Sequence, residues 1–300
     1  MNNKHFLLIL SFGLLFLGIQ NRIEAATTSS STRNSNSQTD AILLKACQDN
    51  NFEAVELAIT NGADVNTLNH NDYGMTPLMY ACMNGNLKIV KLLCVHKALV
   101  SAEDYDYMTP LIYACKNGNL KIVNLLLRKN ACVDAASKTG WTPLIYACIK
   151  GNLELVKILL AKGVMVNTYT DLDMTPLIHA CLNEETDTMK LLLEAKAKVN
   201  VKDSNGMTPL MYACDKKNPK MIKVLLAYNV LIPQDVDAPS MNLIHKAKNE
   251  LITEKRAAIL CNAVPNELIP HDIIGIVSDF LWSTAPHQRA PQANLLTKLD

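Results

Sequence analysis

Six cysteines recur at a nearly constant interval, and cysteine side chains can form disulfides, bind metals or act as nucleophiles. Most of the intervals are 33 residues, and the set is Cys47, Cys82, Cys115, Cys148, Cys181 and Cys214. The chain has no Cys-x-x-Cys or His-Glu-x-x-His pattern, no glycine-rich phosphate loop and no nucleophile motif. The sequence therefore predicts no catalytic residue, no metal site and no cofactor, and we expect no enzymatic activity.

The same interval governs a Thr-Pro-Leu tripeptide, which occurs five times. The copies begin 33 residues apart, at Thr76, Thr109, Thr142, Thr175 and Thr208. A fixed period of this length indicates a stack of one supersecondary unit. Equivalent sites in stacked helices lie about 8–10 Å apart, whereas a disulfide needs Cα atoms within about 7 Å. We therefore expect the six cysteines to fill small core sites. Cys94, Cys132 and Cys261 lie off this register, and the sequence leaves open whether two of them form a disulfide bond.

Each unit predicts two helices separated by a turn. In the third copy, Thr142 suits the N-cap and Pro143 the first helical position, where its missing N–H does no harm. The pair Gly151-Asn152 breaks the chain, because glycine adopts positive φ without strain. Apolar residues then recur at helical spacing from 153 to 159. Gly163 suits the C-cap of this second helix.

Thr-Pro-Leu followed by x-Tyr-Ala-Cys resembles the Thr-Pro-Leu-His-x-Ala signature of ankyrin repeats. The Gly-Asn pairs and the segment Gly62-Ala63-Asp64-Val65-Asn66 also match the ankyrin plan. The resemblance covers residues 40–238, about six repeats. It implies an all-α fold, an ankyrin-repeat solenoid of helix-turn-helix units joined by β-hairpin-like loops.

The two ends of the array depart from the repeat. The first unit, 41–66, lacks Thr-Pro-Leu, as an atypical terminal cap does, and two extra residues precede Thr76, around 69–72. At the other end, one more step of 33 from Thr208 reaches Met241. We interpret 239–262 as a degenerate repeat acting as a C-terminal cap. Lys246 replaces the buried alanine there, which disfavours a fully buried position because an unpaired buried charge is costly.

The ankyrin resemblance implies that loop tips and first helices bind a partner protein on a concave side. A large apolar residue precedes each Thr-Pro-Leu copy, and methionine and tryptophan are adaptable contact residues. The predicted contacts are Met75, Met108, Trp141, Met174 and Met207, with Tyr73, Tyr105, Asp106 and Asp171 beside them. The alternative is that each apolar residue packs against the neighbouring loop and supports the stack. His179 stands where other copies have tyrosine, and we expect a packed histidine at the groove edge.

The N-terminus has the features of a secretory signal peptide in residues 1–26. Lys4 precedes a 14-residue apolar run, 6–19, and a small residue stands at Ala25. The run is short for a membrane span, although an uncleaved anchor is the alternative. Residues 27–39 contain no large apolar side chain and predict a disordered linker. We expect a secreted or periplasmic protein, in one reading delivered into a host cell, with no membrane contact after cleavage.

The C-terminal segment 263–282 predicts an amphipathic helix. Its pattern resembles the opening helix of an F-box, which implies binding to the Skp adaptor of a host ubiquitin ligase. The residues that carry this resemblance are Ile269, Pro270, Ile273, Ile274, Val277, Phe280 and Leu281. The alternative is a helix folded onto the last repeat. Residues 283–300 are polar and predict a disordered tail.

The sequence thus favours a protein–protein interaction scaffold. A net charge of +1 provides no field to attract nucleic acid, and we expect a monomer. The runner-up is a secreted effector that recruits a ubiquitin ligase through its C-terminal helix.

Overall fold

The computed structural model describes residues 37–234 and 236–263, with the backbone alone for 257–263. Within these ranges the chain is all-α, and its only extended pairing is a single bridge between Asn69 and Met75. The described residues form two compact units. Unit 1 comprises 37–198 and 202–206, and unit 2 comprises 199–201 and 207–263. The prediction of an all-α repeat solenoid is confirmed.

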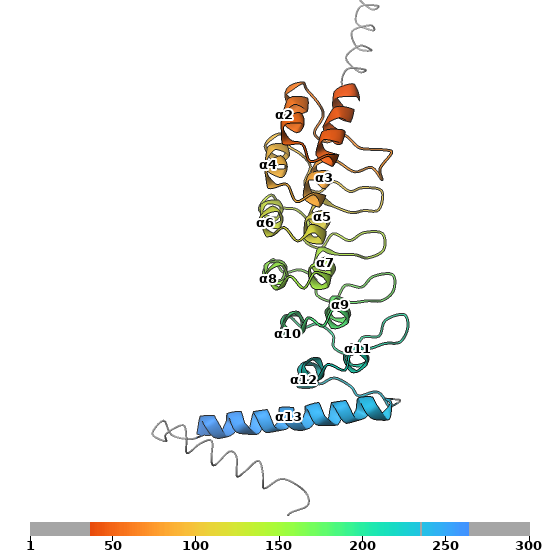
Figure 1. Cartoon of the computed structure of the whole chain (residues 1–300), viewed down its shortest axis with the longest axis vertical. Coiled ribbons are helices and arrows are strands. Elements are labelled where there is room, and N and C mark those ends of the chain that lie inside the picture. Colours follow the sequence, from red (N-terminus) through yellow and green to blue (C-terminus); the bar gives the residue numbers. More distant parts are fainter. Residues whose placement is uncertain (1–36, 235, 264–300) are drawn as a thin grey trace, which may run out of the picture. The chain divides into compact units, whose positions relative to one another are not determined.

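Unit 1 is a stack of helix pairs (Figure 1). A helix spanning 37–48 opens it and pairs with α2 (Phe52–Thr60). The pairs that follow are α3 (Pro77–Met83) with α4 (Leu87–Val95), α5 (Pro110–Asn117) with α6 (Leu120–Arg128), α7 (Pro143–Ile149) with α8 (Leu153–Ala161), and α9 (Pro176–Leu182) with α10 (Thr186–Glu194). The opening helix includes residues 37–39, so this part of the predicted linker is helical; residues 27–36 lie outside the described ranges.

Local chemistry sets the helix boundaries where the sequence predicted them. The Thr142 hydroxyl accepts a hydrogen bond from the Ile145 N–H, and Pro143 begins α7. Asn152 caps α8 in the same way by accepting from the Leu155 N–H. Gly151 and Gly163 both have positive φ, at 60° and 76°. In the next unit Glu184 adopts φ 59° at the position equivalent to Gly151, so the turn persists without glycine.

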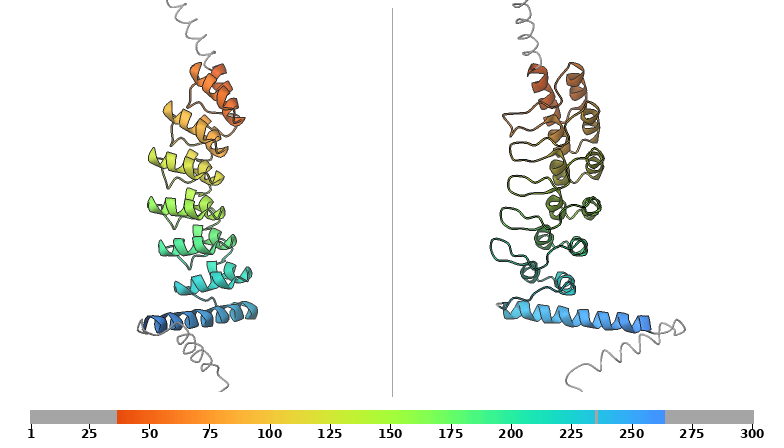
Figure 2. Two further views of the ribbon diagram at one scale, coloured as in Figure 1. Left: turned by 60° about the vertical axis from the view of Figure 1, so that its left-hand side comes forward. Right: turned by 180° about the vertical axis from the view of Figure 1, so that it is seen from behind.

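Three layers make up unit 1, and the core lies between its two helix layers. The loops project to one side of the first helices, and the second helices lie on the other side (Figures 1 and 2). The six cysteines in register are all buried, with free thiols, which confirms the predicted core role. Cys94 is also buried and Cys132 is exposed, and both are free. The side chain of Cys261 lies outside the description.

The first loop is longer than the others, as the sequence predicted. In the second loop the Asp104 N–H donates to the Met108 carbonyl, closing five residues. In the first loop the equivalent hydrogen bond runs from Asn69 to Met75, closing seven. The two extra residues therefore lie inside the loop, between the paired backbone groups.

Unit 2 contains α11 (Pro209–Asp215), α12 (Pro219–Ala227) and α13 (Ala238–Ala263). The expected degenerate repeat over 239–262 is instead one continuous helix. Glu250 and Leu251 stand where most repeats have a turn and an asparagine cap, but Glu184 and Glu185 keep the turn without glycine or a side-chain cap, so this replacement alone does not explain the continuous helix. Ile244 and Ala247 are buried, whereas Lys246 is exposed.

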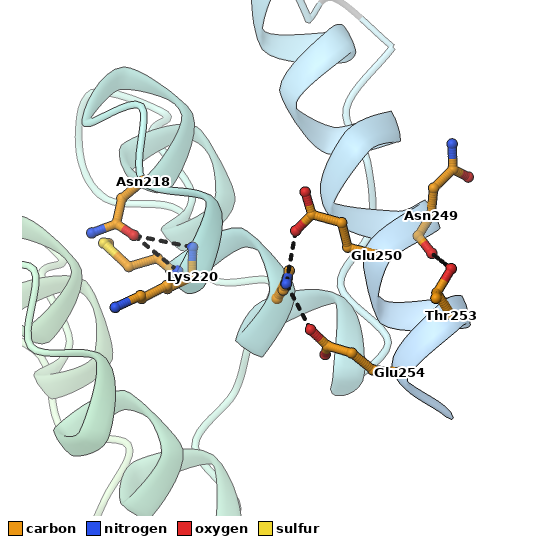
Figure 3. A network of polar contacts seen from close by, with 8 residues as sticks. Asn218, Lys220, Asn249, Glu250, Thr253 and Glu254 are labelled. Carbon is orange, nitrogen blue, oxygen red and sulfur yellow. Dashed lines mark hydrogen bonds and ion pairs between the residues drawn. The ribbon is translucent and has the colours of Figure 1, made fainter. Parts of the chain in front are cut away.

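Helix α13 packs against both α11 and α12. Glu250 and Glu254 of α13 point towards α12, where the Lys223 ammonium lies 2.7 and 2.8 Å from their carboxylates (Figure 3). These hydrogen bonds raise the pKa of Lys223 and lower that of Glu250. In the described part of the chain, no helix is long and apolar enough to cross a membrane.

Candidate functional site

The loops of unit 1 are built on a polar residue that opens each hairpin-like turn. The Asp104 carboxylate accepts hydrogen bonds from the Asp106 and Met108 N–H groups, both at 2.9 Å. In the next loop Ser137 accepts from the Trp141 N–H at 3.1 Å. These short side-chain acceptors satisfy backbone donors that a tight turn leaves unpaired. These hydrogen bonds therefore restrict the backbone of both loops.

Successive loop tips are hydrogen-bonded to one another. The Tyr105 N–H donates to the Tyr73 carbonyl at 2.8 Å, and the Lys138 N–H donates to the Asp106 carbonyl at 2.9 Å. The Asp171 N–H then donates to the Thr139 carbonyl at 3.1 Å. The tips consequently form one continuous row of backbone, with side chains projecting from it at repeat spacing.

Two tyrosines of the first helices anchor this row. The Tyr113 hydroxyl donates to Asp104 at 2.6 Å, and the Tyr80 hydroxyl donates to Asp72. Burial, followed by the hydrogen bond to the carboxylate, raises the pKa of both phenols. Tyr80 and Tyr113 are buried, so they connect helix to loop and offer little contact area to a partner.

The predicted row of apolar contacts divides into buried and half-buried members. Met75 and Met108 are only 4% and 8% exposed, so these two side chains support the stack and present almost no surface to a partner. Trp141 and Met174 are half-buried in unit 1, and Met207 is half-buried in unit 2.

The other predicted contacts are exposed at the loop tips, and the structure adds three that sequence reasoning missed. We define the tip surface as the exposed side chains Tyr73, Tyr105, Asp106, Tyr107, Tyr169, Asp171 and Leu172. Lone apolar side chains on a surface are ordinary, whereas a row of aromatic residues is typical of an interaction surface. Asp106 and Asp171 add negative charge to this row.

Tyr107 is the most informative residue of the tip surface. Its φ is 60°, and it occupies the place that Gly74, Gly140 and Gly206 hold in other loops, also at positive φ. A bulky side chain in this conformation costs about 1–2 kcal/mol relative to the right-handed region. Tyr107 is nevertheless 51% exposed, so packing does not offset that cost. Comparing the loops in register would have revealed this substitution from the sequence alone.

Asp106 and Tyr107 form a small cation-binding arrangement. The Lys138 ammonium lies 3.8 Å from the Asp106 carboxylate and 5.4 Å from the centre of the Tyr107 ring. Such exposed contacts contribute little to stability. The carboxylate and the ring nevertheless show that this part of the tip surface can bind a cationic side chain.

An aromatic cluster lies where the loops meet the first helices in the middle of unit 1. The Trp141 ring centre is 5.4 Å from that of Tyr146 and 5.2 Å from that of His179. Lys116 lies over the Tyr146 ring at 5.9 Å. His179 is buried, as expected for a packed histidine, and burial lowers its pKa to about 4. Its Nε2 atom has no hydrogen-bond partner.

The described residues contain no group of three His, Cys, Asp or Glu side chains placed to hold a metal ion. The predicted adaptor-binding residues, from Ile269 to Leu281, lie outside the described ranges, as do the signal peptide and the C-terminal tail. The interpretation of those segments stays a prediction.

A family model described as ankyrin repeats matches the chain in three copies, over residues 15–104, 95–170 and 150–238. The chain belongs to the ankyrin-repeat family. Ankyrin repeats generally mediate protein–protein interactions and are typically non-enzymatic scaffolds. A search of curated proteins found no match. Membership of this family therefore supports a protein partner. Which protein is bound depends on the surface residues of this particular chain.

Proposed function

We propose that this ankyrin-repeat protein is an interaction scaffold that binds its partner through the tip surface and the adjoining first helices. Tyr107 carries the proposal. It retains a strained backbone conformation where glycine would be relaxed, and about half of the residue's surface is exposed to solvent. A residue that costs stability and contributes little packing is best explained by a contact outside the chain.

The surroundings of Tyr107 support this assignment. Backbone hydrogen bonds hold the tips in one row, so little conformational entropy is lost when a partner binds. Exposed tyrosines provide large contact areas with few rotatable bonds. The half-buried Trp141 and Met174 lie at the base of the loops, where a partner side chain could reach them.

Replacing Tyr107 with glycine tests the proposal, because the change removes the ring and relaxes the backbone together. We expect the stability of Tyr107→Gly to be unchanged or raised by up to about 1 kcal/mol. The purified full chain, immobilised and exposed to cell extract, should retain partner proteins that this variant, combined with Tyr169→Ala, loses in quantitative mass spectrometry.

Leu57→Ala is the matched control, because Leu57 is 62% exposed on a second helix and not on a loop. It should retain the same proteins as the original chain. Equal retention by the double tip variant, or no protein retained specifically by any form, contradicts the proposal.

We also propose that the protein is exported through cleavage of residues 1–26. The support is the order of Lys4, the apolar run 6–19 and Ala25. Mass spectrometry of the protein recovered outside expressing cells should give a chain that begins at residue 26 or 27. An intact N-terminus on cell-associated protein favours the uncleaved anchor instead.

A further inference from the structure

The second helices α4 and α6 of unit 1 carry an unbalanced positive charge. No aspartate or glutamate occurs between 84 and 102 or between 117 and 133. We define the basic patch as the six exposed cationic residues of these helices and their C-terminal ends, Lys88, Lys91, Lys97, Lys121, Arg128 and Lys129. Because α4 packs against α6, the patch is continuous across two repeats.

On the neighbouring second helices α8 and α10, a lysine is paired with an acidic side chain, whereas the cations of α4 and α6 have no such partner. In α8 the Lys157 ammonium lies 3.9 Å from Glu154, and in α10 the Lys190 ammonium lies 3.1 Å from Asp187. Within the described part of the chain, none of the six residues of the basic patch forms an ion pair. Their charge is therefore available to a ligand.

Two of these lysines oppose the local electrostatics of their own helices. Lys88 and Lys121 are the second residues of α4 and α6, where the helix dipole favours a negative side chain. The equivalent positions of α8 and α10 hold Glu154 and Asp187, as the dipole prefers. Within unit 1 the local preference is broken at this register on α4 and α6 alone, and Lys220 repeats the departure on α12 of unit 2. Two adjacent departures are typical of a surface kept for binding.

We propose that the basic patch binds an acidic segment of a partner protein, at a second site separate from the tip surface. The second helices and the loops lie on opposite sides of the first helices in unit 1 (Figure 2). This inference goes beyond the proposed function, since either site can fail without the other. Charge complementarity of this kind accelerates association and selects the partner.

The composition of the patch favours a protein segment over nucleic acid. No aromatic side chain occurs on α4 or α6 to stack against bases. Five of its six cations are lysines, which bind as point charges and lack the paired geometry with which arginine grips a phosphate. The chain as a whole has a net charge of only +1, far from the basic character of most nucleic-acid-binding domains.

Helix α4 also carries an exposed aliphatic residue beside its lysines. Val95 is 75% exposed and occupies the same register on α4 as Arg128 on α6. A membrane-binding surface usually adds tryptophan or other aromatic side chains at the interface, and neither helix supplies one. An acidic segment with aliphatic side chains between its carboxylates matches both the lysines and Val95.

The variant Lys88→Glu/Lys121→Glu tests the proposal without threatening the fold, because glutamate suits both helix N-termini. The probe is a fluorescent peptide of about five helical turns that carries glutamates, with leucines between them, on one face. Fluorescence anisotropy with the full chain should show binding that weakens as salt is raised. The variant should bind about tenfold or more weakly.

The charge-matched control is Lys190→Glu/Lys196→Glu, which introduces the same change on and after α10. It should leave peptide affinity within about twofold of the original chain. The tip variant Tyr107→Gly should also bind the peptide normally, which separates this site from the proposed function. Equal peptide binding by the Lys88 and Lys121 variant overturns the proposal. So does binding of duplex DNA or phosphatidylserine vesicles through these lysines when the peptide does not bind.

Discussion

At the residue scale, His179 shows how one substitution in a repeat changes the chemistry of the core. Other copies place a tyrosine at this position, and two of these tyrosines, Tyr80 and Tyr113, satisfy their hydroxyl groups with loop carboxylates. His179 contacts Trp141 instead, and its Nε2 atom is buried without a partner. A buried imidazole in these surroundings is held in its neutral form.

The neutral state of His179 predicts acid sensitivity of the fold. Burial lowers its pKa from 6.5 to about 4, so protonation below pH 6.5 favours the unfolded chain. Above pH 6.5 the burial of neutral His179 does not lower the free energy of unfolding. Between pH 6.5 and pH 4 it lowers that free energy by up to about 1.4 kcal/mol per pH unit. Urea unfolding midpoints of the original chain should fall more steeply over this range than those of His179→Tyr. Parallel pH profiles would show that the pKa of His179 is not lowered in the folded protein.

The cysteines predict a second pattern at this scale, in thiol reactivity. Burial raises the pKa of Cys47 to about 12 and raises that of the other buried thiols in register, so they lack thiolate at neutral pH. In a Cys261→Ser background, a thiol reagent should modify Cys132 rapidly and the buried thiols only on unfolding. Adding Cys132→Ser should abolish the fast reaction. Rapid loss of several thiols from the folded protein contradicts the assigned core.

At the element scale, two asparagines between paired helices, Asn119 and Asn152, have two functions each. The Asn119 side-chain oxygen accepts hydrogen bonds from the Lys121 and Ile122 N–H groups and so caps α6. Its amide nitrogen donates to the Gly85 carbonyl of the preceding repeat at 3.0 Å. Asn152 repeats the arrangement by donating to the Gly118 carbonyl. One residue therefore starts a helix and connects neighbouring repeats.

Two substitutions at Asn119 separate these functions. Aspartate keeps the capping oxygen and loses the donor, whereas alanine loses both. We expect Asn119→Ala to destabilise the protein by about 2–3 kcal/mol and Asn119→Asp by about 1 kcal/mol, the value of one hydrogen bond. Urea denaturation followed by circular dichroism measures both. Equal losses in the two variants would mean that capping contributes nothing beyond the contact between repeats.

Helix positions could be predicted from the sequence because they depend on local signals. Threonine caps, proline and the Gly-Asn turns act within a few residues, and α7 and α8 begin where these signals predict. These signals do not account for α13, because Glu184-Glu185 keeps the turn without glycine or a side-chain cap, whereas the helix continues through Glu250-Leu251.

At the scale of the whole molecule, surface assignment is where the sequence was least informative. Met75, Met108, Trp141 and Met174 share one register, yet the first two are buried and the others half-buried. Their exposure depends on the neighbouring residues that cover each side chain, and the repeat pattern does not specify those neighbours. Likewise, the basic patch emerges only when α4 and α6 are placed side by side. Periodicity fixes which residues are equivalent, and packing decides which of them remain accessible.

The ends of a repeat array decide its solubility, because an internal repeat leaves one apolar face uncovered there. In unit 2 helix α13 covers this face by burying Ile244 and Ala247 against the α11–α12 pair. Burying one isoleucine contributes about 1.5–3 kcal/mol. A chain ending at Asp237 should therefore unfold at lower urea concentration and bind a hydrophobic dye. A chain ending at Ala263 keeps α13 and controls for the shorter length. If both truncated chains unfold at the same urea concentration, α13 does not act as a cap.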